Sequence, residues 1–185
     1  LKQCQNSSIN KVCKGMLEFL TVQESCCYDA IVCTWALMYE QPQKVLNQCQ
    51  RLLKNGGYLY ILVNDQQTLP QIRKIYPKLL IEYVGSINKL MFDLPMPNNA
   101  QQLERWAKKA GLKNCRVTSK KQEFYFTDWN RAAKFVTSTG ALAGYDAMLD
   151  LKNEKIFNTL VEQLQKFFTK PCITHHFVMG IFKKG

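Results

Sequence analysis

The sequence predicts an α/β fold organised around one strand–helix–strand unit between Tyr28 and Val63. Tyr28 to Cys33 is a short and almost wholly apolar run, which is typical of a strand covered on both faces. Tyr58 to Val63 is a second run of residues that favour strands. Because a helical pattern separates the two runs, we expect parallel strands joined by a right-handed crossover.

The connecting helix has clear start and stop signals. Pro42 fits the first helical turn, where a missing backbone N–H costs little. Apolar side chains then recur at helical spacing, at Val45, Leu46, Cys49, Leu52 and Leu53. Asn55-Gly56-Gly57 ends the helix, because these residues accept a positive φ. Ligands in such sheets bind at the carboxyl ends of the strands, which here are residues 33–35 and 63–65.

The flanking segments add further elements. Periodicity, caps and breakers predict a short strand at 11–14, a helix at 69–80, a helix at 98–111, strand-forming runs at 112–117 and 123–126, helices at 129–138 and 153–168, and a last strand at 172–183. Asn98-Asn99 and Asp128 are the expected helix caps. Pro77 is expected to kink or end the first of these helices.

Composition narrows the class of protein. The 185 residues fit one domain, residues 1–185, and no apolar run reaches the roughly 18 residues of a membrane span. The net charge of +11 favours anionic partners or substrates, although scattered charge is also typical of an ordinary solvated surface. The eight cysteines form no CxxC pair and no zinc-finger spacing, so we expect reduced thiols, a cytoplasmic protein and no metal site.

Three segments carry a resemblance to class I S-adenosylmethionine-dependent methyltransferases. Tyr28–Cys33 resembles the fourth strand of that family, written F/Y-D-x-I/V-x, and Trp35–Tyr39 resembles the x-A-L-H-W/H segment after it. Arg51–Leu59 resembles the R-x-L-K-P-G-G-x-L turn into the fifth strand, with Asn55 in place of the common proline. The similarity is greatest to the methyltransferase type 11 group, which includes the trans-aconitate and biotin-pathway enzymes.

The resemblance implies an incomplete Rossmann-like methyltransferase fold with a mostly parallel sheet and an antiparallel last strand. Lys11–Phe19 is similar to the third strand and its turn, and Phe177–Lys184 is similar to the closing strand. The first two strands and the Gly-rich cofactor loop of the family would lie upstream of Leu1, so we expect a chain truncated at its N-terminus. Residues 64–97 and 128–170 correspond to the variable substrate or lid regions.

The resemblance implies transfer of a methyl group from S-adenosylmethionine to a small organic acceptor, a carboxylate or a hydroxyl. The predicted cofactor-binding residues are Met16, Leu17, Cys33, Thr34, Trp35 and Tyr39. No catalytic residue can be assigned, and the truncated chain alone is expected to be inactive. The acceptor is expected to be a small, anionic molecule, and the oligomeric state is left open.

Two alternatives remain. The chain could be a cofactor-less pseudoenzyme that binds a partner, or, less favoured, an RNA methyltransferase. Cys33-Thr34-Trp35-Ala36 lacks the N/D-P-P-Y/F/W type of motif that holds a flipped base. His175 is expected to be structural, and Arg73, Arg116 and Arg131 are candidates to pair with a substrate carboxylate.

Overall fold

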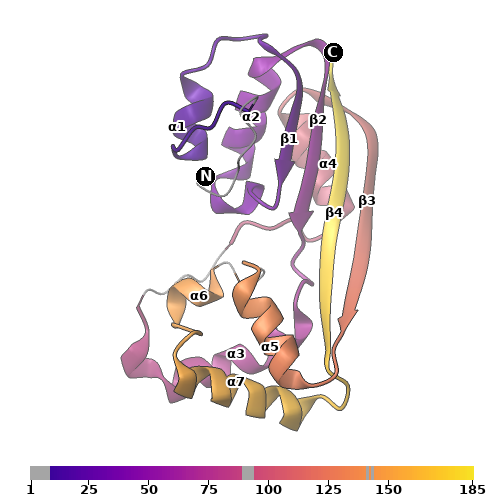
Figure 1. Cartoon of the computed structure of the whole chain (residues 1–185). Helices are drawn as coiled ribbons and strands as arrows, with labels where there is room; N and C mark the ends of the chain where they lie inside the picture. The colour runs from indigo at the N-terminus through magenta and orange to yellow at the C-terminus, as the bar shows by residue number, and fades with distance from the viewer. Residues whose placement is uncertain (1–8, 89–93, 141, 143) are drawn as a thin grey trace.

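The computed structural model describes residues 9–88, 94–140, 142 and 144–185. Its centre is a four-stranded sheet of order β1-β2-β4-β3 (Figure 1). The strands are β1 (Tyr28–Thr34), β2 (Leu53–Asn64), β3 (Leu112–Tyr125) and β4 (Cys172–Lys184). The β1 and β2 strands are parallel, whereas β4 runs antiparallel to both β2 and β3.

This topology confirms the α/β class, the parallel pair and the antiparallel last strand. The expected mostly parallel sheet is not found in the described residues, because β4 inserts between β2 and β3 and makes both of their pairings antiparallel. The strand expected at Lys11–Lys14 is also wrong, since these residues have no regular structure and none of the strands in the described residues lies beside them to pair with. Within the described residues, β1 is therefore an edge strand of the sheet.

One face of the sheet is covered by helices. These are α1 (Met16–Thr21), α2 (Pro42–Leu52) and α4 (Ala100–Lys109), with the short η1 turn (Leu37–Tyr39) after β1 (Figure 1). Fully buried Leu46 and Leu52 of α2 and Leu103 of α4 pack against Leu59 and Phe182 of the sheet. The alternation of a strand places every second side chain in this core.

The other face of the sheet is open over much of β1, β2 and β4. Val32 is 67% exposed, and Tyr58, Tyr60 and Met179 are exposed as well. The expectation that β1 is covered on both faces is therefore wrong for the described residues. The apolar run does form a strand, but only Cys33 of β1 is buried. The remaining side chains of the strand are exposed or half-buried.

A second helical group packs at the far end of the long β3–β4 pair (Figure 1). It comprises α3 (Pro70–Glu82), η2 (Val84–Ser86), α5 (Trp129–Ser138), α6 (Tyr145–Met148) and α7 (Glu154–Phe167). Ile72 and Leu79 of α3 and Leu160 and Leu164 of α7 form its core together with Ile173 of β4. This group anchors α5 beside the sheet.

The predicted caps are confirmed. The Asn99 carboxamide accepts from Gln102 N at 3.0 Å at the start of α4, and the Asp128 carboxylate accepts from Arg131 N at 2.8 Å at the start of α5. The α3 helix continues through Pro77 to Glu82, so of the kink or end expected at Pro77 the end is not found; Pro77 lies on the exposed side of the helix, between buried Tyr76 and exposed Lys78.

Candidate functional site

A cavity of about 400 Å³ lies at the carboxyl ends of β1 and β2. This volume is within the range of small-molecule sites, about 300–1,000 Å³. Its lining consists of Trp35, Met38, Tyr39, Asn64, Gln122, Phe124, Phe135, Thr139, Gly140, His175 and Phe177. Five of these side chains carry aromatic carbon rings and none is a lysine, arginine, aspartate or glutamate, so we call it the aromatic cavity. The position agrees with the strand ends that the sequence indicated.

Trp35 forms the rim of the aromatic cavity where β1 ends. Its φ of +55° is a left-handed conformation that a bulky residue rarely adopts. The Trp35 N–H donates to Leu62 O at 2.7 Å, which holds the turn against β2. The indole meets the Phe177 ring edge-on at a centroid distance of 5.7 Å. Unusual backbone held in place by its surroundings is a common feature of functional sites.

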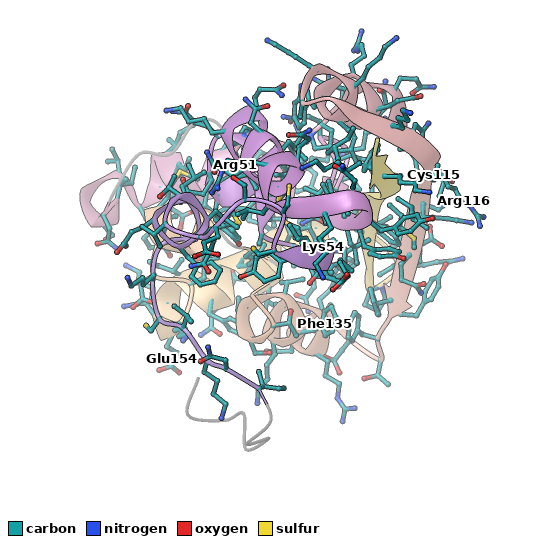
Figure 2. All side chains as sticks on the ribbon, turned by 90° about the horizontal axis from the view of Figure 1, so that it is seen from above. Arg51, Lys54, Cys115, Arg116, Phe135 and Glu154 are labelled. Carbon is teal, nitrogen blue, oxygen red and sulfur yellow. The ribbon has the colours of Figure 1, made fainter. Side chains whose placement is uncertain are left out.

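The opposite wall comes from the helical group and the β3–β4 pair. Phe135 of α5 contacts Phe124 of β3 at a centroid distance of 5.0 Å, and Phe124 in turn meets His175 edge-on at 5.7 Å. Figure 2 labels Phe135 on its helix below the sheet end. Asn64, almost fully buried at the end of β2, accepts a hydrogen bond from the Thr68 hydroxyl at 3.5 Å. Polar groups thus occur only at separate points of an apolar lining.

The structure brings together two of the six predicted cofactor-binding residues. Trp35 and Tyr39 line the aromatic cavity, and Thr34 precedes them on the open side of β1. Met16 and Leu17 of α1 instead pack against the core on the covered face and do not line the cavity. The assignment of all six to the cofactor stays a prediction.

Cys33 points into the covered core. Burial raises the pKa of the Cys33 thiol, and burial raises the pKa of Cys49 in α2 to about 12. Both thiols therefore stay protonated near neutral pH and are unsuited to nucleophilic attack. All cysteines of the described part of the chain are free.

Sequence reasoning missed most of the far wall. His175 was expected to be a structural residue, but its side chain lines the aromatic cavity, and burial lowers the pKa of its imidazole. Among the described residues, no hydrogen bond to its ring is found. Phe124 and Phe135 also went unassigned, whereas Asn64 lies within the strand end 63–65 that the sequence indicated. The alternation of β4 predicted only that His175 and His176 face opposite sides.

The three arginines proposed to bind a carboxylate lie elsewhere. Arg73 lines two other depressions beside α3, Arg131 pairs with Asp128 at 3.9 Å, and Arg116 points outward from β3 (Figure 2). The structure brings none of them to the aromatic cavity. In the part of the chain that is described, no three His, Cys, Asp or Glu side chains gather as a metal site would require. None of the helices described there has the length and apolarity needed to cross a membrane.

Comparison with known proteins supports the resemblance. The profile of the methyltransferase domain family matches residues 2–61, which include α1, β1, α2 and most of β2. No curated protein matches the chain significantly. Among solved structures, a protein from Bacillus halodurans C-125 assigned as a methyltransferase aligns with a TM-score of 0.50 and 13% identity, covering 88% of this chain and 72% of its own.

Two other solved structures are similar. The [4+2]-cyclase SpnF aligns with a TM-score of 0.51 and 12% identity, over 94% of this chain and 56% of its own. A SAM-dependent methyltransferase from Archaeoglobus fulgidus has a TM-score of 0.46 and 14% identity, over 99% of this chain and 71% of its own. The chain thus spans 56% to 72% of the length of these proteins.

The fold is that of the class I S-adenosylmethionine-dependent methyltransferases, as the sequence motifs indicated. One neighbour of similar TM-score is a cyclase, so the fold alone does not fix the reaction.

Proposed function

We propose that this chain forms the acceptor-binding part of an S-adenosylmethionine-dependent methyltransferase that acts on a small organic molecule. The observation that carries the proposal is the aromatic cavity at the carboxyl ends of β1 and β2, because Trp35, Met38 and Tyr39 of its lining lie within residues 2–61, the segment that matches the methyltransferase domain family. The volume and apolar lining suit a small molecule rather than a polymer.

The residues at the rim fit one part of the cofactor. S-adenosylmethionine, when bound, supplies a methyl group on a positively charged sulfonium. Trp35 and Tyr39 are both exposed at the rim, where an aromatic face stabilises a cation without forming a salt bridge. Methyl transfer needs mainly positioning and the exclusion of water, and the apolar lining of the cavity favours both.

We propose further that residues 1–185 act as one domain in which 64–97 and 128–170 select the acceptor. Phe135, Thr139 and Gly140 of the second segment support this role, because they form one wall of the aromatic cavity. The net charge of +11 favours an anionic acceptor, but the lining supplies no cationic side chain to pair with one. We propose a cytoplasmic location from the free thiols.

The test is binding of S-adenosylhomocysteine to the protein purified as its full-length natural chain, measured by titration calorimetry. We expect saturable heat that is weakened by Trp35→Ala and unchanged by Tyr125→Ala, whose parent ring is 69% exposed and lies outside the aromatic cavity. Absence of heat at millimolar ligand would contradict the proposal. The alternative, a partner-binding module without cofactor, is favoured by the open apolar face with Val32 and Tyr60, and it would then be preferred.

A further inference from the structure

The polar groups of the aromatic cavity suggest which chemical group reacts there. His175 comes from β4, Gln122 lies opposite it on β3, and Asn64 ends β2. These side chains offer hydrogen bonds and carry no fixed charge. Only the imidazole of His175 can take up a proton. A carboxylate brought into such a lining would lose its hydration without gaining a cationic partner, which is unfavourable. A molecule with a neutral hydroxyl on an aromatic ring could stack its ring on the aromatic side chains of the cavity, and its hydroxyl could hydrogen-bond to a nitrogen of the imidazole.

The strand register places His175 on the cavity side. Phe177 pairs with Asn64 of β2, and His175, two residues earlier on β4, shares that face of the sheet. Phe124 supports the imidazole from one edge at 5.7 Å. The ring is thus held at the cavity wall without any hydrogen bond from the described protein groups that would occupy its nitrogens.

We propose that His175 accepts the proton of an uncharged aromatic hydroxyl bound in the aromatic cavity, so that the acceptor class is a neutral phenol-like molecule. This inference rests on the proposed function. The hydroxyl oxygen gains the methyl carbon and loses its proton to the imidazole, and the sulfonium, having lost its methyl group, becomes a neutral thioether. Charge is conserved, since one cation is consumed and one imidazolium is formed.

Burial favours the unprotonated form of the imidazole, in which a ring nitrogen can accept a proton. Burial lowers the pKa of His175 below that of a free histidine. Tyr39 of η1 lines the cavity, whereas Lys120 of β3, which lies opposite Phe177 on this face of the sheet, is exposed and is not part of the lining. Lys121 and Glu123 point to the opposite face of β3 and form an ion pair with each other at 2.8 Å. No carboxylate lines the cavity to raise the imidazole pKa.

The first test is nuclear magnetic resonance of the imidazole signals. The chain has two histidines, so His176→Gln assigns them without ambiguity. The probes are 2-naphthol, naphthalene and 2-naphthoate, which share a ring system and differ in the reacting group. We expect 2-naphthol to bind most tightly and to shift the His175 signal but not that of His176. Tighter binding of 2-naphthoate, or a shift confined to His176, would overturn the proposal.

Variants separate a direct contact from a structural role. His175→Phe keeps a ring against Phe124 but removes the nitrogens, and we expect it to weaken 2-naphthol binding about 3-fold to 10-fold, the range of one neutral hydrogen bond. Naphthalene should bind the variant as it binds the parent, which shows that the cavity is intact. Equal affinity of 2-naphthol for the parent and for His175→Phe would refute the role.

Calorimetry with S-adenosylhomocysteine distinguishes this inference from the function on which it rests. If S-adenosylhomocysteine binds and 2-naphthol leaves His175 undisturbed, the acceptor class is wrong and the methyltransferase remains. If 2-naphthol binds at His175 and S-adenosylhomocysteine does not bind, the cavity assignment holds and the methyltransferase is wrong. With methyl transfer to 2-naphthol by the full-length natural chain as the readout, His175→Phe should lower the rate roughly 10²-fold to 10⁴-fold while S-adenosylhomocysteine binding is unchanged.

Discussion

The two faces of the sheet differ in cover rather than in composition. On one face Leu59 and Ile61 of β2 are buried beneath α2 and α4, and on the other Tyr58 and Tyr60 of the same strand are exposed. A half-covered strand normally alternates between apolar and polar residues, whereas this one is apolar on both sides. The residue types therefore indicate that both faces of the strand could be buried. They do not show which face the helices of the chain actually pack against.

The same contrast explains where the aromatic cavity lies. It sits on the open side, where Trp35, His175 and Phe177 are not overlaid by α2 or α4. The group of α3, α5 and α7 covers only the far end of that side, through contacts such as Phe135 with Phe124. The aromatic cavity therefore lies at the border between the covered and the open part of one face.

The largest expected difference in stability is between substitutions of two neighbouring residues that lie on opposite faces of the sheet. Leu59→Ala removes a fully buried side chain, and we expect a loss of about 2–5 kcal/mol in the free energy of unfolding. Tyr60→Ala, one residue on and 40% exposed, should cost about 1 kcal/mol or less. Urea denaturation followed by circular dichroism measures both. Equal losses would show that the open face is covered in solution.

The next largest loss of stability is expected at Gly57, near the start of β2. A Cβ added at Gly57 would lie 2.9 Å from both Asp29 O and Lys54 O, so Gly57→Ala forces backbone to move, and we expect a loss of about 1–3 kcal/mol. Gly85→Ala is the matched control, because a Cβ at Gly85 meets nothing within 4 Å. The same denaturation experiment applies. A tolerated Gly57→Ala would mean that β1 and β2 are not packed as closely as the structure shows.

These glycines illustrate what the sequence could predict. The predicted role of Asn55-Gly56-Gly57 as the end of the helix was wrong, because α2 ends at Leu52 with an extended Leu53, and the three residues lie within β2. The need for glycine at this point was nevertheless predicted from local chemistry, since Gly56 takes a φ of +80° and Gly57 allows the close approach. The caps at Asn99 and Asp128 were correct for the same reason, since a cap bonds to residues two or three positions away. Local signals of this kind need no tertiary information.

The aromatic cavity could be predicted only in part. Trp35 and Tyr39 follow β1 directly, so the strand-end rule found them. His175 and Phe135 are more than 90 residues away in the sequence and reach the site through strand pairing and helix packing, which no local pattern encodes. The strand predicted at Lys11–Lys14 was wrong for a related reason. A short segment becomes a strand only where a neighbouring strand is available to pair with it.

The smallest effect is expected at the exposed ion pair that links β1 to β2. Lys54 Nζ lies 2.8 Å and 3.0 Å from the two carboxylate oxygens of Asp29, and both side chains are well exposed, so salt and water screen the pair. The hydrogen bond from Lys54, followed by its charge, lowers the pKa of Asp29. Asp29→Asn should therefore shift the urea midpoint only slightly at pH 7.

The pH dependence gives this small effect a definite sign. Because the pKa of Asp29 is lower in the folded chain than the unfolded value of about 3.9, its contribution is present above that value and is lost as the pH falls through the folded pKa. The difference between the parent and Asp29→Asn should shrink toward zero between about pH 4 and pH 2. Glu123→Gln, in the exposed Lys121 pair on β3, should behave in the same way. A difference that grows on acidification would mean that Asp29 is held by burial rather than by Lys54, and that the β1 edge is covered in solution.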